Sequence, residues 1–198
     1  DEKLENVDQI LPSLEIAARE GRPMVIIADE VEGQALAALI MNTVRGSMKV
    51  AAIKSPRYGE ERRQLMQDLC STVGAKYFSQ FLGNSLTGSS VSIEDFGAAK
   101  SVVVSSHETT IVGGLGDAEE ISQRMSAIES QIGECTSERE TSFLLERKTK
   151  LASGVAVVRV GAPTEVEMLE KKHRIEDALE AVKSALQEGF VPGGGLTL

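Results

Sequence analysis

The sequence has no tryptophan, two cysteines, two histidines and no long apolar run. Because aromatic residues make up only 4% of the chain, it lacks the platforms on which single-stranded nucleic acids stack. Cys70 and Cys135 belong to neither a Cys-x-x-Cys motif nor a Cys/His cluster, so we expect two inert thiols in a reducing compartment. No run is long enough to span a bilayer and no signal peptide is recognisable, so we expect no membrane association.

Positive charge is also in short supply. The chain has 21 lysine and arginine residues against 30 aspartate and glutamate residues, which gives a formal net charge of −9. Nucleic acids and anionic membranes are therefore poor partners. With 198 residues, 41% of them hydrophobic, the chain can form one good core and parts of two domains. It begins at Asp1 without a methionine, and we expect it to be a piece of a longer protein.

The most informative stretch runs from Val31 to Gly46 and is rich in alanine and leucine, which favour a helix. Leu36 and Ile40 share one stripe of this helix, and Ala35 and Leu39 share a second. A surface helix needs only one apolar stripe to face a core. Either the helix is buried on all sides, which the pattern alone favours, or one stripe is left open for a partner.

The remaining patterns predict an α/β fold. Two short apolar runs flank the 31–46 helix, which indicates a parallel βαβ unit. Because proline is favoured in a first helical turn, we expect the regular part of the first helix to start near Pro12. In the first half of the chain we expect a helix ending at Gly21, strands at 24–28 and 49–53, and a helix at 59–72. In the second half we expect a β-hairpin of 101–104 with 109–112 and a helical hairpin carrying Ile121–Ile132 and Leu144–Leu151. A strand at 154–160 and a helix at 164–188 complete the expected elements.

A glycine-rich run, Gly113–Gly116, precedes the helical hairpin. Such a loop at a helix N-terminus can hold a phosphate. However, Asp117, Glu119 and Glu120 crowd this N-terminus with negative charge, and no lysine or arginine is near. The motif is incomplete, and the pattern disfavours a phosphate site here.

Several runs occur in an order that covers nearly the whole chain. They include Val31-Glu32-Gly33-Gln34-Ala35-Leu36-Ala37, Asn42-Thr43-Val44-Arg45-Gly46, Lys49-Val50-Ala51-Ala52-Ile53-Lys54, Arg174-Ile175-Glu176-Asp177-Ala178-Leu179 and Gly193-Gly194-Gly195. In these runs and in their order along the chain, the sequence resembles the group I chaperonins, which are the bacterial GroEL and organellar sixty-kilodalton type. The resemblance implies a GroEL-like apical domain over residues 1–154 that lacks its first segment, part of the intermediate domain over 155–188, and the start of the equatorial return segment over 189–198.

The resemblance also implies a binding groove. In the family, the helix that matches Val31–Arg45 and the helix before it line a groove that takes unfolded polypeptide and the mobile loop of the ten-kilodalton co-chaperonin. The matching residues here are Leu11, Leu14, Leu36, Ile40 and Met41, with Asn42 as a polar neighbour. An unfolded client offers apolar side chains without fixed geometry, and a flexible apolar surface suits it.

Asp177 matches the family aspartate that positions or activates the water that attacks the nucleotide. On sequence alone, an aspartate between Glu176 and Glu180 indicates a solvated helix face. Gly194 and Gly195 match glycines near the nucleotide. The resemblance thus implies ATP and Mg²⁺ in the full-length parent; we expect neither bound to this fragment, which alone should not hydrolyse ATP.

Other matches concern movement and assembly in a homo-oligomeric ring. Glu165 matches a carboxylate that pairs with a neighbouring subunit, although a carboxylate that favours the helix N-terminus explains it equally well. Gly154 and Gly189 match the upper and lower hinges. Ser153 and Arg57 stand where relatives usually have glycine.

The alternative hypothesis is a free-standing α/β enzyme that binds a phosphate ligand through Gly193–Gly195. No combination of nucleophile, base and oxyanion donor supports it, and we see no metal ligands. For a chaperonin we expect a cytoplasmic location, or the mitochondrial matrix or chloroplast stroma.

Overall fold

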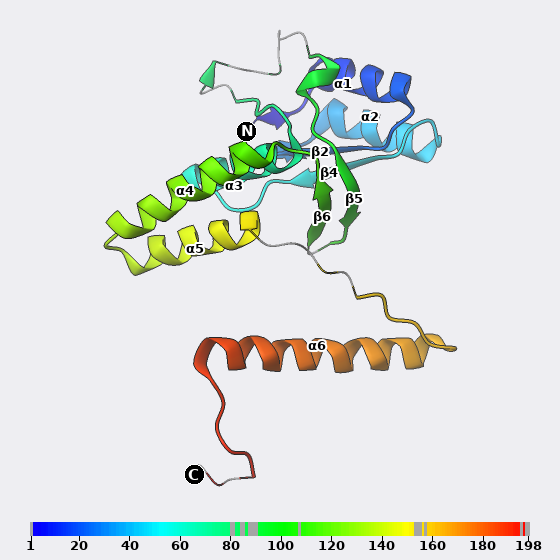
Figure 1. The fold of residues 1–198 in the computed structure, drawn as a ribbon. Helices are drawn as coiled ribbons and strands as arrows, with labels where there is room; N and C mark the ends of the chain where they lie inside the picture. The colour runs from blue at the N-terminus through cyan, green and yellow to red at the C-terminus, as the bar shows by residue number, and fades with distance from the viewer. Residues whose placement is uncertain are drawn as a thin grey trace. The chain divides into compact units, whose positions relative to one another are not determined.

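The computed structural model describes residues 2–79, 82–83, 86, 91–106, 108–152, 156, 158–194 and 196. The chain divides into two compact units, residues 1–155 and 156–198. The first is a mixed α/β unit, and the second contains one long helix (Figure 1). We describe each unit by itself.

The predicted parallel βαβ unit is confirmed. Strands β2 (Met24–Ala28) and β4 (Val50–Lys54) pair in parallel on either side of helix α2 (Gly33–Val44) in the chain. The predicted helix is shortened at its N-terminus, because Glu30–Val31 forms a short strand, β3, that pairs in parallel with β1 (Lys3–Leu4). Helix α2 therefore begins after two residues of strand rather than at Val31.

Helix α1 (Val7–Glu20) ends as predicted, with Gly21 in the left-handed conformation at φ 63°. The prediction that its regular part starts near Pro12 is wrong, since the helix begins at Val7 and Pro12 lies inside it. The side chain of Gln9 stabilises this earlier start, because its Oε1 accepts hydrogen bonds from the backbone N–H groups of Glu5 (2.9 Å) and Asn6 (3.0 Å).

The core of the first unit lies between α1, α2 and the parallel strands. Its buried apolar residues are Leu4, Ile10, Leu14, Ala17, Met24, Ala28, Ala35 and Leu39. Helix α1 contributes Ile10, Leu14 and Ala17, which follow one another at helical spacing on a single face. This packing holds α1 and α2 together at one end of the unit (Figure 1).

The other end is built on helix α3 (Gly59–Val73). After a short 3₁₀ helix, η2 (Ile93–Asp95), strands β5 (Ala99–Val104) and β6 (Thr109–Gly114) form the predicted antiparallel hairpin. Helices α4 (Ala118–Glu134) and α5 (Glu138–Ala152) form the predicted helical hairpin, and both pack against α3 (Figure 1).

A buried ionic cluster joins α3 to both helices of this hairpin. The Asp68 carboxylate accepts hydrogen bonds from Arg147 Nε (2.7 Å) and Nη2 (3.0 Å), and it also pairs with Arg124. Gln64 Oε1 accepts a further bond from Arg147 Nη1 at 2.7 Å. Because Asp68 and Arg147 are both buried, neither can exchange its partner for water.

The second unit consists mainly of helix α6 (Glu165–Glu188). The Thr164 hydroxyl caps it by accepting from the backbone N–H of Glu167 (3.3 Å), and Gly189 follows its last residue, as predicted. The predicted strand at 154–160 is wrong for its described residues, Ala156 and Val158–Val160, which form no strand. A β-prone run needs a paired neighbour, and the described part of this unit holds no other strand to supply one.

We predict that Asp68→Ala destabilises the first unit by about 3–5 kcal/mol, because it leaves the buried Arg147 guanidinium without its countercharge. Urea unfolding followed by circular dichroism measures this loss. The matched control is Glu129→Ala, which removes the exposed Glu129–Lys148 pair (2.7 Å) between the same helices α4 and α5. That change should cost no more than about 1 kcal/mol. Equal losses in the two variants would contradict a special role for the buried cluster.

Candidate functional site

Helix α2 has one buried face and one exposed apolar face. Ala35 and Leu39 are 0% and 4% exposed, whereas Leu36, Ile40 and Val44 are 38%, 51% and 78% exposed. The three exposed residues follow one another at intervals of four and therefore form one row along the helix. Full burial of the helix, which the pattern alone favours, is wrong, and the open stripe is the arrangement observed.

The other predicted groove residues divide into two groups. Met41 on α2 and Leu11 on α1 are exposed, as an accessible binding surface requires. Leu14 is buried in the core with Ile10, so the prediction that it belongs to an exposed patch is wrong. The Asn42 side chain serves the end of its own helix, because Nδ2 donates to the carbonyl of Ala38 (2.9 Å) and Oδ1 accepts from the Ser47 hydroxyl (3.1 Å).

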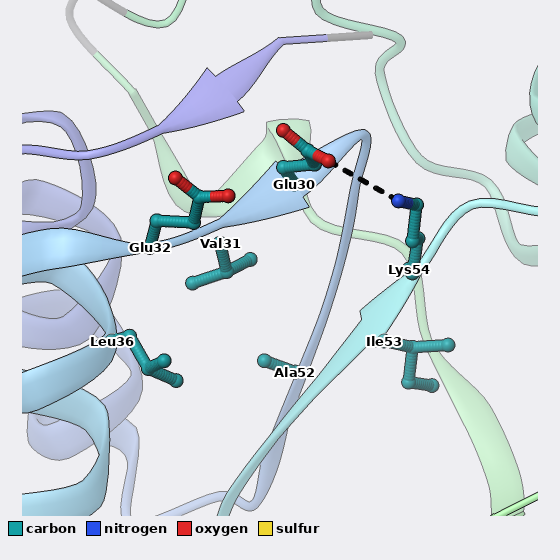
Figure 2. A pocket seen from close by; sticks show the side chains of 7 residues that line it. All are labelled: Glu30, Val31, Glu32, Leu36, Ala52, Ile53 and Lys54. Atoms are coloured by element: carbon teal, nitrogen blue, oxygen red, sulfur yellow. Dashed lines mark hydrogen bonds and ion pairs between the residues drawn. The ribbon is translucent and has the colours of Figure 1, made fainter.

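A pocket of about 300 Å³ adjoins the exposed row at the start of α2. Figure 2 shows Val31, Leu36 and Ala52 directed toward one another, with charged side chains above and beside them. The pocket takes residues from β3, α2 and β4, and its lining residues are Glu30, Val31, Glu32, Leu36, Ala52, Ile53 and Lys54. Leu36 thus belongs both to the exposed row and to this pocket.

Ion pairs fix the charged rim of the pocket. Lys54 Nζ lies 3.2 Å from Glu30 Oε1, and Lys3 Nζ lies 3.2 Å from Glu32 Oε2. The hydrogen bond and the positive charge of Lys54 lower the pKa of Glu30 below its usual value, so this carboxylate is ionised at neutral pH. The pocket therefore combines an aliphatic floor with permanent charges at its edge.

Comparison with known proteins identifies the family. Residues 3–198 match the TCP-1/cpn60 chaperonin family. The chain belongs to this family. Membership indicates a protein-folding chaperone that acts on client polypeptides as part of an oligomeric assembly, and chaperonins typically depend on ATP and Mg²⁺.

The chaperonin residues predicted for ATP turnover and assembly lie on or after α6. Asp177 and Glu165 are both exposed, and Arg174, one turn before Asp177, pairs with Glu170. Glu165 is the first residue of α6, where a carboxylate favours the helix dipole. The exposure of Asp177 agrees with a solvated helix face, and the place of Glu165 agrees with a carboxylate that stabilises the helix N-terminus, while the functional roles of both stay predictions.

The predicted hinge and nucleotide glycines are only partly within the described residues. Gly189 and Gly194 adopt positive φ angles of 83° and 72°, which a residue with a side chain rarely adopts. Gly154 and Gly195 lie outside the described residues. Conformational freedom at Gly189 is compatible with the predicted lower hinge.

Three other features of this chaperonin chain bear on function: metal-binding groups, membrane-spanning helices and reactive cysteines. In the described ranges, no three His, Cys, Asp or Glu residues form a group suited to a metal ion. None of the described helices is long and apolar enough to cross a membrane. Cys70 and Cys135 are free, and burial raises the pKa of Cys70 to about 11, which keeps this thiol protonated and unreactive.

The Gly113–Gly116 loop serves packing. The backbone N–H of Gly116 donates to the carbonyl of Thr72 (3.0 Å), and that of Leu115 donates to Ala98 (2.9 Å). A Cβ atom at Gly116 would lie 1.8 Å from the carbonyl oxygen of Ser71, and one at Gly114 would lie 2.3 Å from that of Thr72. These glycines let the loop approach the end of α3, and two of the N–H groups that a phosphate would need are already used.

We predict that Gly116→Ala destabilises the first unit by about 1–3 kcal/mol, because the new methyl group collides with backbone that cannot move aside cheaply. The matched control is Gly133→Ala in α4, where a Cβ atom meets nothing within 4 Å. The control should raise stability by up to about 1 kcal/mol, since alanine is the better helix former. Thermal unfolding of the two variants measures the contrast, and a stable Gly116→Ala variant would contradict the packing role.

Proposed function

We propose that this chain binds unfolded polypeptides on the exposed apolar face formed by Leu36, Ile40, Met41 and Val44 of α2 together with Leu11 of α1. The main support for this proposal is that the row of Leu36, Ile40 and Val44 is exposed while Ala35 and Leu39 anchor the same helix in the core. An apolar row that is open to solvent on a fixed helix is a surface that a partner can cover.

The chemistry of this face suits a client without a defined structure. Its side chains are aliphatic or thioether groups, which adapt to differently shaped partners. The polar side chain of Asn42, the residue after Met41, uses Nδ2 and Oδ1 within its own helix end and so makes few directional demands on a ligand. Each apolar client side chain that becomes fully buried would contribute about 1.5–3 kcal/mol before the cost of ordering the segment.

Within the chaperonin family we further propose the group I type, in which the same face takes the mobile loop of a ten-kilodalton co-chaperonin. The support is the resemblance of the sequence runs around α2 and α6 to that group. An extended co-chaperonin loop and an unfolded client share one requirement, an apolar segment without tertiary structure, so one face can serve both.

For a longer, ring-forming parent we propose that ATP hydrolysis drives the cycle and that Asp177 orients the attacking water. The support is the run Arg174–Leu179 and the exposed position of Asp177, which leaves its carboxylate available to a ligand. Gly194 and Gly195 would lie near the nucleotide, and Glu165 would pair with a neighbouring subunit.

The rival proposal, a free-standing phosphate-binding enzyme, has weaker support. The larger cavity of the first unit, about 550 Å³, is lined mainly by apolar side chains such as Met24, Leu69 and Val102. It includes no residue of the Gly113–Gly116 loop. We therefore prefer the chaperonin function for this chain.

The binding proposal predicts that Ile40→Glu weakens binding of a reduced, alkylated and permanently unfolded protein by at least about 10-fold, because apolar client segments cannot cover a carboxylate without a penalty. Since Ile40 is half exposed, the free energy of unfolding should change by no more than about 0.5–1 kcal/mol. Fluorescence anisotropy measures the affinity, and urea unfolding measures the stability.

Two control variants make this result interpretable. Gln131→Glu adds the same charge to an exposed position on α4 and should leave client binding unchanged. Leu39→Glu places the charge on the buried face of α2 and should unfold the domain. Unfolding of the Ile40→Glu variant itself, or unchanged client binding by it, would contradict the groove proposal.

The ATPase proposal predicts that Asp177→Ala, made in a full-length parent, slows single-turnover hydrolysis by about 10²–10⁴-fold. Nucleotide affinity should be nearly unchanged, because a group that orients water acts mainly in the transition state. The melting temperature should not fall, since Asp177 is exposed on a helix and alanine is a better helix former. Glu180→Ala on the same helix is the control; unchanged turnover in Asp177→Ala would leave that residue a solvated surface group.

A further inference from the structure

The exposed row of α2 leads into the charged pocket shown in Figure 2. Leu36 lies at the N-terminal end of the row and lines the pocket, so an apolar segment that covers the row continues into it. From Leu36 to Val44 the helix rises about 12 Å, which matches three to four residues of extended chain. The residue that follows such a segment at the Leu36 end would meet the pocket.

The rim of this pocket has a residual negative charge. Lys3 Nζ contacts the carboxylates of Glu5 (3.0 Å), Glu32 (3.2 Å) and Glu30 (3.6 Å), and Lys54 contacts Glu30 as well. Among the residues that line the pocket, Glu30 and Glu32 are acidic and Lys54 is basic, which leaves one negative charge in excess. The Glu32 side chain is 55% exposed, so it remains accessible to a further cation.

The shape of the pocket suits a long basic side chain. Its floor is aliphatic, from Val31, Leu36 and Ala52, and its carboxylates stand at the edge (Figure 2). Lysine and arginine bury their methylene stems on apolar surface while their charged ends stay near water or a counter-ion. An acidic side chain placed there would face Glu32 and Glu30, whose cationic partners are already engaged.

We propose that the pocket is a specificity subsite that takes a lysine or arginine flanking an apolar client segment, with its stem on Val31, Leu36 and Ala52 and its charged end at Glu32. This inference rests on the proposed binding of unfolded polypeptides by α2 and names the client class that the site prefers. Apolar segments with a basic neighbour should bind in preference to neutral or acidic ones.

The test uses the 198-residue chain and three fluorescent peptides with blocked termini. The peptides share a core of four leucine and valine residues and differ in one flanking residue, which is lysine, glutamine or glutamate. Anisotropy titrations should give an affinity for the lysine peptide about 3–5-fold above that for the glutamine peptide, the range expected for an exposed ion pair. The difference should vanish in 0.5 M salt.

A matched pair of variants assigns this preference to the pocket. Glu32→Gln should abolish the preference for lysine and leave the affinity for the glutamine peptide unchanged. Glu5→Gln removes an equally exposed carboxylate from the same Lys3, but Glu5 does not line the pocket, so the preference should persist. A wild-type chain without the preference, a preference for glutamate, or a preference that survives Glu32→Gln would overturn the inference.

The same peptides distinguish a failure of the basic subsite from a failure of the proposed polypeptide binding by α2. Ile40→Glu should weaken binding of all three peptides, because it changes the apolar row that they share. If the peptides bind and Ile40→Glu has no effect, the proposed groove is wrong, and if none of them binds, both proposals fail. If Ile40→Glu weakens all three equally while lysine gives no advantage, only the subsite is wrong.

Discussion

Burial of Ala35 and Leu39 is the constraint on which the candidate site depends. These two side chains fix the rotation of α2 about its own axis, because both face the core made by α1 and the parallel strands. With that face fixed, Ile40 and Val44 point away from this core, and Leu36 lies on the flank of the helix, so all three stay exposed. The exposed row is thus a consequence of packing and needs no separate stabilising device.

Each end of the first unit is stabilised by a different kind of contact. Around α1 and α2 the buried residues are apolar, and the fit of side chains determines the arrangement. Between α3, α4 and α5 the buried Asp68 and Arg147, with the half-buried Gln64, form hydrogen bonds that require particular directions. An ionic cluster of this kind fixes how the helical hairpin sits on α3 and does not depend on the apolar face that we propose for clients.

The sequence predicted most elements because their signals are local. The apolar runs of β2 and β4, the capping Thr164 of α6 and the glycines after α1 and α6 each act within a few residues. The failures involve partners distant in the chain. Which row of α1 is buried depends on where α2 lies, and this is why periodicity does not reveal that Leu14 is buried. The described residues of the run at 154–160 form no strand, and the described part of their unit holds no strand that could pair with them.

For the site, periodicity identified the apolar stripes of α2 but could not say which one faces water, since both are apolar. The resemblance to chaperonins points to the row of Leu36 and Ile40, and both side chains are exposed, while their binding role stays a prediction. The charged pocket was not predicted, because Lys54 reaches Glu30 across 24 residues of chain and Lys3 reaches Glu32 across 29. No pattern within one element contains such a contact.

Arg57 holds a left-handed backbone in the loop before α3. It has the one positive φ, 63°, among the described non-glycine residues. A left-handed backbone costs a residue with a side chain about 1–2 kcal/mol. The same side chain donates to Glu61 (2.8 Å) and Glu146 (2.6 Å) and lies over the Phe143 ring at 5.1 Å.

Those contacts are of the size needed to offset the strain. A partly exposed ion pair contributes up to about 1 kcal/mol, and a cation–π contact adds about 0.5–1 kcal/mol. Glycine would avoid the strained backbone but could make none of these contacts. Because Glu61 lies on α3 while Glu146 and Phe143 lie on α5, Arg57 ties the loop before α3 to the helical hairpin. Arginine at this position therefore anchors the loop to the hairpin at the cost of a strained backbone.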